Sequence, residues 1–210
     1  MTGISNTAIR RSFSLAAAGL ALFAVLSNVA PAQPPVQILS RTNLLEYRDD
    51  SGTVKPVTNA AEWAKRRANI LAAMQQVMGL MPDDDRRVDL AVKIEEEADA
   101  GSYIRRLITY QSEPRSRTPA YLCIPKDVLA GERKTAAVLC LHPTDNKVGH
   151  KVVVGLGGRA GRQYAAELAE RGYVTLSPAY PRLANYWPNL GKRGYVSGTM
   201  KAIWDNSRGL

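Results

Sequence analysis

The sequence contains few of the residues that metal and thiol chemistry require. Among its 210 residues are two cysteines, Cys123 and Cys140, and two histidines, His142 and His150. Two histidines cannot form a His-rich metal set, and we expect neither a metal nor another cofactor. Each cysteine lies in an apolar segment that predicts a strand. The two thiols either pair in an oxidising compartment or stay free and buried.

Acidic residues are scarce relative to basic ones. The chain has 28 Lys and Arg against 19 Asp and Glu, which gives a formal net charge of +9. A basic excess raises the question of nucleic-acid binding. The basic residues are scattered in doublets such as Arg66-Arg67 and Arg105-Arg106, without a basic stretch interleaved with aromatic residues. We therefore expect a solvated basic surface and no nucleic-acid partner.

Long apolar runs are confined to the N-terminal region. Arg10-Arg11 precede an apolar run over residues 15–29, and Ala30-Pro31-Ala32 follows. This order predicts a signal peptide at residues 1–32. The run is short for a membrane span, although an uncleaved anchor is the alternative. We expect export to the periplasm or the extracellular space, by Sec or by the twin-arginine route that the Arg pair resembles, and no further membrane association.

The motif Gly-x-Ser-x-Gly, which holds the nucleophile in many hydrolases, does not occur. In Gly194-Tyr195-Val196-Ser197-Gly198 the serine stands one place late, and a predicted helix follows directly. We interpret Gly198-Thr199 as the start of that helix, which runs on through Trp204.

Between the predicted signal and the strands, the sequence predicts an irregular tether at residues 33–57 and one helix. Asn59 is a suitable N-cap with Glu62 three residues later, and Gly79 suits a left-handed C-terminal position. The helix carries an apolar stripe that we expect to pack against the fold: Trp63, Ile70, Leu71, Met74, Val77 and Met78.

The rest of the chain predicts an α/β fold within a domain at residues 58–210. Antiparallel strands come first, at 88–94, 103–110 and 120–124, with a loop at 112–118. A buried apolar strand at 136–141, a helix at 162–171 and a strand at 173–176 then form a βαβ unit. Such a unit implies a parallel pair of strands covered by helices.

Two loops of this unit could carry chemistry. His142-Pro143-Thr144 follows the strand at 136–141, where α/β sheets place ligands and where backbone N–H groups can stabilise an oxyanion. The alternative is a structural His142 that shapes a turn. Residues 155–160 fit the dinucleotide pattern G-x-G-x-x-A, but Ser177-Pro178 stands where the acidic partner belongs. A flexible glycine-rich loop is therefore the favoured interpretation.

Three stretches together resemble exported bacterial α/β-hydrolases of the dienelactone-hydrolase and acetylxylan-esterase-like group. They lie at 63–79, at Leu139–Thr144 and at 194–206, where Gly-Tyr-Val-Ser-Gly-Thr-Met-Lys-Ala-Ile-Trp-Asp-Asn is the most specific. The resemblance covers most of residues 60–210 and corresponds to the N-terminal portion of such enzymes. It implies that Thr144 supplies a backbone oxyanion donor and that His142 shapes the oxyanion loop.

The same resemblance implies hydrolysis of acyl esters by a serine carboxylesterase-type mechanism in intact relatives, acting on small-molecule or carbohydrate esters. The Ser-Asp-His triad would lie beyond residue 210. We therefore expect a partial α/β-hydrolase sheet truncated before the nucleophile-elbow strand, with residues 136–141 at an unpaired apolar edge, and an inactive fragment. The alternatives are an exported, non-catalytic small-ligand-binding protein and a nucleotide-binding oxidoreductase. The sequence predicts no oligomeric state.

Overall fold

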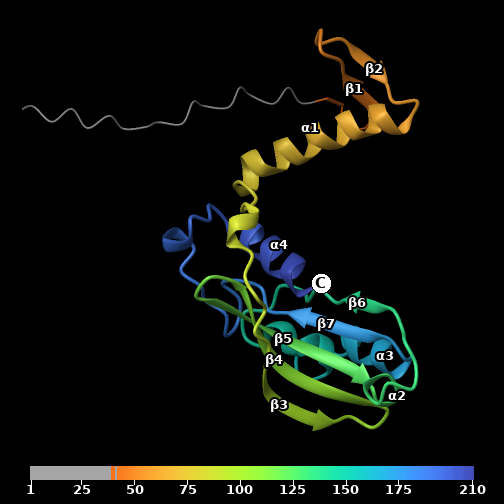
Figure 1. Cartoon of the computed structure of the whole chain (residues 1–210), viewed down its shortest axis with the longest axis vertical. Helices are drawn as coiled ribbons and strands as arrows, with labels where there is room; N and C mark the ends of the chain where they lie inside the picture. Colours follow the sequence, from red (N-terminus) through yellow and green to blue (C-terminus); the bar gives the residue numbers. More distant parts are fainter. Residues whose placement is uncertain (1–38, 41) are drawn as a thin grey trace, which may run out of the picture. The chain divides into compact units, whose positions relative to one another are not determined.

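The computed structural model describes residues 39, 40 and 42–210 (Figure 1). The signal peptide expected at residues 1–32 lies outside this range, so export stays a prediction, as do the proposed domain boundaries. None of the helices within the range combines the length and the apolar character that a membrane span requires.

A short antiparallel hairpin occupies part of the segment expected to be an irregular tether. β1 (Glu46–Arg48) pairs with β2 (Val54–Pro56). The Asp49 carboxylate accepts a hydrogen bond from the Thr53 N–H at 3.0 Å, and Gly52 adopts a φ of +83° in the turn. Turn chemistry rather than hydrophobic alternation forms this hairpin, which is why the expectation of irregular structure at these residues was wrong.

Helix α1 (Ala60–Met78) is confirmed together with its N-cap. The Asn59 side chain accepts a hydrogen bond from the Glu62 N–H at 3.0 Å. The Glu62 carboxylate accepts a hydrogen bond from the Thr58 N–H at 2.7 Å, one residue earlier than in the usual capping box. Gly79 has φ +95° and ψ 163°, an extended conformation open only to glycine, so the expected left-handed helical cap was wrong.

The apolar stripe of α1 is largely exposed, contrary to the packed face that its spacing predicts. Met78 at the end of the helix packs with Tyr195, Met200 and Trp204. The other side of the helix rests on the hairpin, where the Tyr47 hydroxyl donates to Glu62 at 3.3 Å. The exposed fractions along the stripe are 41% for Trp63, 40% for Leu71, 44% for Met74 and 81% for Val77. Periodicity predicts the helix but does not supply a neighbour for each face.

A five-stranded mixed sheet forms the body of the fold, in the order β3-β4-β5-β7-β6 (Figure 1). β3, β4, β5 and β7 pair antiparallel in turn, and β6 pairs parallel to β7. The parallel pair is joined through α3, which confirms the βαβ unit. The strands are β3 (Lys93–Asp99), β4 (Tyr103–Glu113), β5 (Ser116–Pro125), β6 (Ala137–Leu139) and β7 (Val174–Pro178).

Short helical segments and two longer helices connect and cover the strands. They are η1 (Asp84–Arg86), α2 (Lys126–Leu129), η2 (Gly149–Val154), α3 (Tyr164–Glu170), η3 (Gly191–Arg193) and α4 (Gly198–Gly209). The two helices predicted in this half of the chain are confirmed as α3 and α4. Ser197 is the N-cap of α4, and its hydroxyl accepts from the Met200 N–H at 3.1 Å.

The two edge strands differ from their predictions. β3 starts at Lys93 rather than Val88 and includes the acids that were expected to follow it. An edge strand exposes its side chains, so acids are tolerated there: Arg106 Nε donates to Glu97 at 2.6 Å. β6 is shorter than predicted and half-exposed rather than buried on both faces. Its position at the edge agrees with the unpaired apolar edge expected at residues 136–141.

The turn between β4 and β5 is also tighter than the predicted loop at 112–118. Ser112 and Glu113 end β4, Ser116 begins β5, and only Pro114 and Arg115 lie between the strands. Arg115 adopts a left-handed φ of +58° to close the turn.

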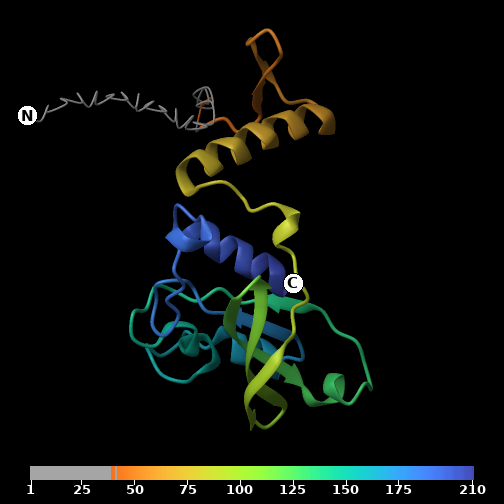
Figure 2. The same ribbon diagram turned by 60° about the vertical axis from the view of Figure 1, so that its left-hand side comes forward.

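Side chains alternate across β5 and thereby assign one helix to each face of the sheet. Tyr121 and Cys123 join a cluster with α3, whereas Ala120 joins the opposite cluster with Leu176. On that second face Gly209 of α4 approaches Leu176 closely. Figure 2 shows α4 in dark blue beside the sheet. Helices thus cover both faces, as a central α/β sheet requires.

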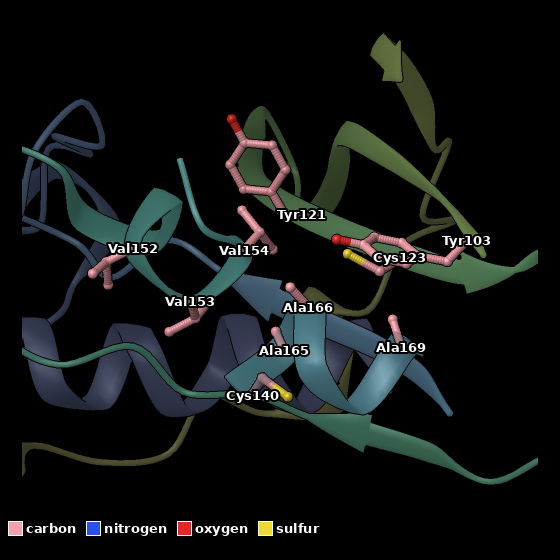
Figure 3. Close-up of a cluster of buried hydrophobic side chains, with 10 residues drawn as sticks. All are labelled: Tyr103, Tyr121, Cys123, Cys140, Val152, Val153, Val154, Ala165, Ala166 and Ala169. Carbon is pink, nitrogen blue, oxygen red and sulfur yellow. The ribbon is translucent and has the colours of Figure 1, made fainter. Parts of the chain in front are cut away.

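The larger cluster contains both cysteines as free, buried thiols (Figure 3). Alanines of α3 and Val152–Val154 of η2 pack around them. Burial raises the pKa of the Cys123 thiol to about 11 and also raises the pKa of Cys140. Of the two alternatives left open by the sequence, the structure has the unpaired thiols, in an environment that disfavours the reactive thiolate.

Candidate functional site

The predicted site loop lies at the C-terminal end of β6, beside the loop that follows β7. Thr144 from the first loop, Tyr180 from the second and Thr199 from the start of α4 line one cavity of about 450 Å³. The complete lining is Leu141, Thr144, Tyr180, Pro181, Leu183, Gly198, Thr199, Ala202, Ile203 and Asn206. The chain therefore brings Thr144 together with α4, although more than fifty residues separate them in the sequence.

His142 is not among the residues that line this cavity, but it joins the two loops. Its side chain is 4% exposed. The Tyr180 N–H donates to Nε2 at 3.0 Å, so the proton resides on Nδ1, which lies 2.9 Å from the Pro143 carbonyl oxygen and donates to it. Burial lowers the pKa of His142. Both ring nitrogens of the neutral imidazole are engaged, which is the geometry of a histidine that shapes a turn.

Asp145 fixes the chain that follows Thr144. Its carboxylate accepts hydrogen bonds from the N–H groups of Lys147 at 2.9 Å and Val148 at 2.7 Å. These backbone donors lower the pKa of Asp145, which stays ionised. With His142 on one side and Asp145 on the other, the loop is held at both ends.

Two residues that line this largely apolar cavity, Thr144 and Asn206, carry polar groups without a hydrogen-bond partner in the described residues. Within the described part of the chain, the Thr144 N–H donates to no acceptor. Asn206 Oδ1 is buried and accepts no hydrogen bond from any residue at 39, 40 or 42–210. A buried acceptor without a donor is costly, and a ligand that donates a hydrogen bond would satisfy it. Sequence reasoning missed Asn206 as a site residue, although it closes the most specific of the three resembling stretches.

The second histidine does not reach the cavity. His150 is 1% exposed and lies against Tyr121, with 5.0 Å between the ring centroids. Neither of its ring nitrogens has a hydrogen-bond partner in the described residues. Burial lowers the pKa of His150 to about 4. It is a neutral core residue near pH 7.

Ser197, the serine of the sequence that comes nearest to Gly-x-Ser-x-Gly, also has a structural role. The Ser197 hydroxyl donates to the Met78 carbonyl at 2.6 Å and caps α4. It serves as a helix cap and a tie to α1, in line with a helix start rather than a nucleophile elbow. Across residues 39, 40 and 42–210, no group of three or more His, Cys, Asp or Glu side chains is arranged to hold a metal ion.

The glycine-rich segment at 155–161 lacks the setting of a dinucleotide site. The preceding valines, Val152–Val154, belong to η2 and are buried, whereas the fingerprint requires a strand at that position. The helix that follows, α3, begins only at Tyr164. The segment also does not line the cavity at Thr144. The nucleotide-binding alternative therefore loses its structural basis.

The comparisons with known proteins concern the fold. No protein-family model and no curated protein sequence matches the chain. Among solved structures, a proposed acetyl xylan esterase from Bacteroides fragilis matches with a TM-score of 0.53 and 15% identity, over 70% of this chain and 42% of that one. Acetyl xylan esterase 1 from a Thermoanaerobacterium species matches with a TM-score of 0.35 and 14% identity, over 49% and 28%. The chain thus spans less than half the length of either protein, and the likeness to the first is one of fold: the mixed sheet corresponds to a partial α/β-hydrolase sheet.

Proposed function

We propose that the chain carries the oxyanion-loop side of an acyl-ester hydrolase site. The observation that carries this proposal is the position of Thr144. It follows the edge strand of the parallel pair, its N–H is unused within the described chain, and it borders a cavity of about 450 Å³. A backbone N–H fixed at such a position stabilises the negative charge that develops on a carbonyl oxygen during acyl transfer.

The proposed substrate is an acetylated carbohydrate. The likeness to a solved acetyl xylan esterase supports this class. The cavity also suits it, since Leu141 and Ile203 offer apolar surface for an acetyl methyl group. Asn206 also lines the cavity, and its buried Oδ1 has no hydrogen-bond donor among the described residues. His142 has the role of holding the loop that presents Thr144.

We further propose that residues 39–210 do not supply the general base of the reaction. The sequence has two histidines. His142 uses both ring nitrogens, and His150 is buried away from the cavity. Proton transfer from a serine nucleophile needs an imidazole nitrogen within hydrogen-bond reach. We therefore expect no triad-dependent turnover of p-nitrophenyl acetate by this chain and no labelling by a fluorophosphonate probe.

A binding experiment tests the oxyanion-loop proposal separately from turnover. Calorimetry with a fully acetylated methyl xyloside compares Thr144→Pro, which removes the N–H, with Thr144→Ala, which keeps it. The proposal predicts that Thr144→Ala binds within about threefold of the parent and that Thr144→Pro binds at least about fivefold more weakly, the effect of one hydrogen bond of about 1 kcal/mol. Equal affinity of the two variants would remove Thr144 from the site.

A second function, non-catalytic binding of a small ligand, is favoured by Asn206 alone. The buried Asn206 Oδ1 lacks a hydrogen-bond donor in the described chain, and this is costly in a binding protein as well as in an enzyme. Stabilisation of the parent chain by a polyol or amide ligand, lost in Asn206→Leu and unaccompanied by ester binding, would favour this function over the first. Export through a signal at residues 1–32 belongs to both proposals and is tested in the Discussion.

A further inference from the structure

A second cavity, of about 300 Å³, lies away from the Thr144 loop and is lined by an excess of cations. It is formed by the β4–β5 turn, η1 and η3. Arg86, Arg115, Lys192 and Arg193 contribute four positive charges, and Glu113 contributes the one carboxylate. The net charge of the lining is therefore 4 − 1 = +3.

The single carboxylate cannot neutralise all four cations, because it pairs with Arg86 and Arg193 and is also shared with buried groups. Glu113 Oε1 lies 3.0 Å from the Nζ of the fully buried Lys201, and Glu113 Oε2 accepts from the Tyr195 hydroxyl at 3.0 Å. Lys201 is balanced in turn by Asp205 at 2.5 Å. Glu113 is also 97% buried as a side chain and reaches Arg86 at 3.3 Å and Arg193 only at 3.5 Å. The buried groups Lys201, Glu113 and Asp205 carry a net charge of 1 − 2 = −1, and the four cations that line the cavity exceed it.

Two of the arginines are held in place by the backbone. Arg86 Nη1 donates to the Arg193 carbonyl at 2.7 Å, and Arg193 Nη1 donates to the Pro114 carbonyl at 3.3 Å. Gly194, at a φ of +73°, allows this approach, because a Cβ there would lie 3.3 Å from Arg86 Nη2. The Nη2 and Nε donors of Arg86 find no acceptor in the described chain, and neither do the side chains of Arg115 and Lys192.

We propose that this cavity binds a doubly charged tetrahedral oxyanion, a phosphate or sulfate group. Guanidinium forks match the oxygens of such groups in pairs, and a fixed fork loses little freedom on binding. Like charges gathered in excess of their counterion repel one another, and an anion relieves that repulsion. A volume of about 300 Å³ also accommodates the group with several waters of roughly 30 Å³ each. The inference is independent of the proposed esterase function.

The test is calorimetric titration of the full chain with inorganic phosphate and with sulfate at low ionic strength. The variant Arg115→Gln/Lys192→Gln removes two exposed cations, neither of which holds the fold together. The control Arg67→Gln/Lys134→Gln removes two exposed cations elsewhere. We expect saturable binding of one anion by the parent, at least about tenfold weaker binding by the site variant, and a change within about twofold in the control.

Phenyl phosphate distinguishes the two sources of the group. Affinity equal to that of inorganic phosphate indicates recognition of the free ion, and tighter binding indicates an ester headgroup; both support the site. Unchanged melting temperatures of the variants without anion show that they fold, and Lys192→Gln alone replaces the double variant if it does not. Non-saturable binding, equal losses in site variant and control, or acetate binding as tightly as phosphate would overturn the proposal.

Discussion

Mild acid should destabilise the fold through His150. This imidazole is 1% exposed and has no hydrogen-bond partner among the described residues, so burial opposes its protonation, as does the nearby charge of Lys151. Its pKa falls from 6.5 to about 4 in the folded chain. The unfolded chain therefore binds a proton at a higher pH than the folded chain does, and stability is lost as the pH falls from about 6.5 to about 4.

The size of the loss follows from the two pKa values. Between pH 7.5 and pH 5, the linkage relation gives a decrease of about 2 kcal/mol in the free energy of unfolding from this one group. His142, whose pKa is also lowered, contributes in the same direction. The carboxylates with lowered pKa values, such as Glu113 and Asp145, lose their stabilising effect only when the pH falls below their unfolded pKa. A measurement that goes no lower than pH 5 therefore reports the change in stability that comes from the histidines.

Urea unfolding followed by tryptophan fluorescence at pH 7.5, 6.5, 5.5 and 5.0 measures this loss. His150→Leu removes the titrating group and keeps an apolar side chain of similar volume against Tyr121. We expect the parent to lose about 2 kcal/mol more than His150→Leu over this range. If the two proteins lose the same stability, His150 is not the buried neutral group that the structure describes.

Three further predictions concern charge, capping and export. Lys201→Ala leaves two buried carboxylates without their partner and should cost about 3–5 kcal/mol in urea unfolding, whereas Lys192→Ala at the surface should cost under about 0.5 kcal/mol; equal costs would contradict the buried network. Asn59→Ala removes the α1 cap and should lower helix stability by about 1 kcal/mol, measured by hydrogen exchange of the first turn; unchanged exchange would refute the cap. Expression with residues 1–32 in a bacterial host should give a periplasmic product whose N-terminal sequence follows Ala32; an unprocessed cytoplasmic product would refute export.

Elements with a strong local signal were predictable from the sequence. The cap at Asn59, the buried strand before Pro178 and the helix that includes Trp204 are set by side chains close to them in the chain. The place of the loop at Thr144, after the strand at 136–141, was also predictable, whereas its role as an oxyanion donor stays a prediction. Each of these features depends on residues within one supersecondary unit.

Features that depend on distant neighbours were not predictable. The spacing of the apolar residues in α1 predicts a helix, but it does not show whether another element contacts Val77. The acidic residues of β3 are tolerated because that strand lies at the edge of the sheet. The unsatisfied acceptor of Asn206 and the enclosure of Glu113 likewise arise from contacts across many residues. Composition alone indicated a dispersed basic surface, whereas folding gathers four of its cations around one cavity.

We propose that the cavity at Thr144 binds an acyl ester through the loop after β6. Amide NMR of the ¹⁵N-labelled chain, titrated with the acetylated methyl xyloside, tests it most directly. We expect saturable shifts of the Thr144 backbone amide and the Asn206 side-chain amide, with the 155–161 amides unchanged. Saturable shifts confined to other residues, or none at all, would contradict it.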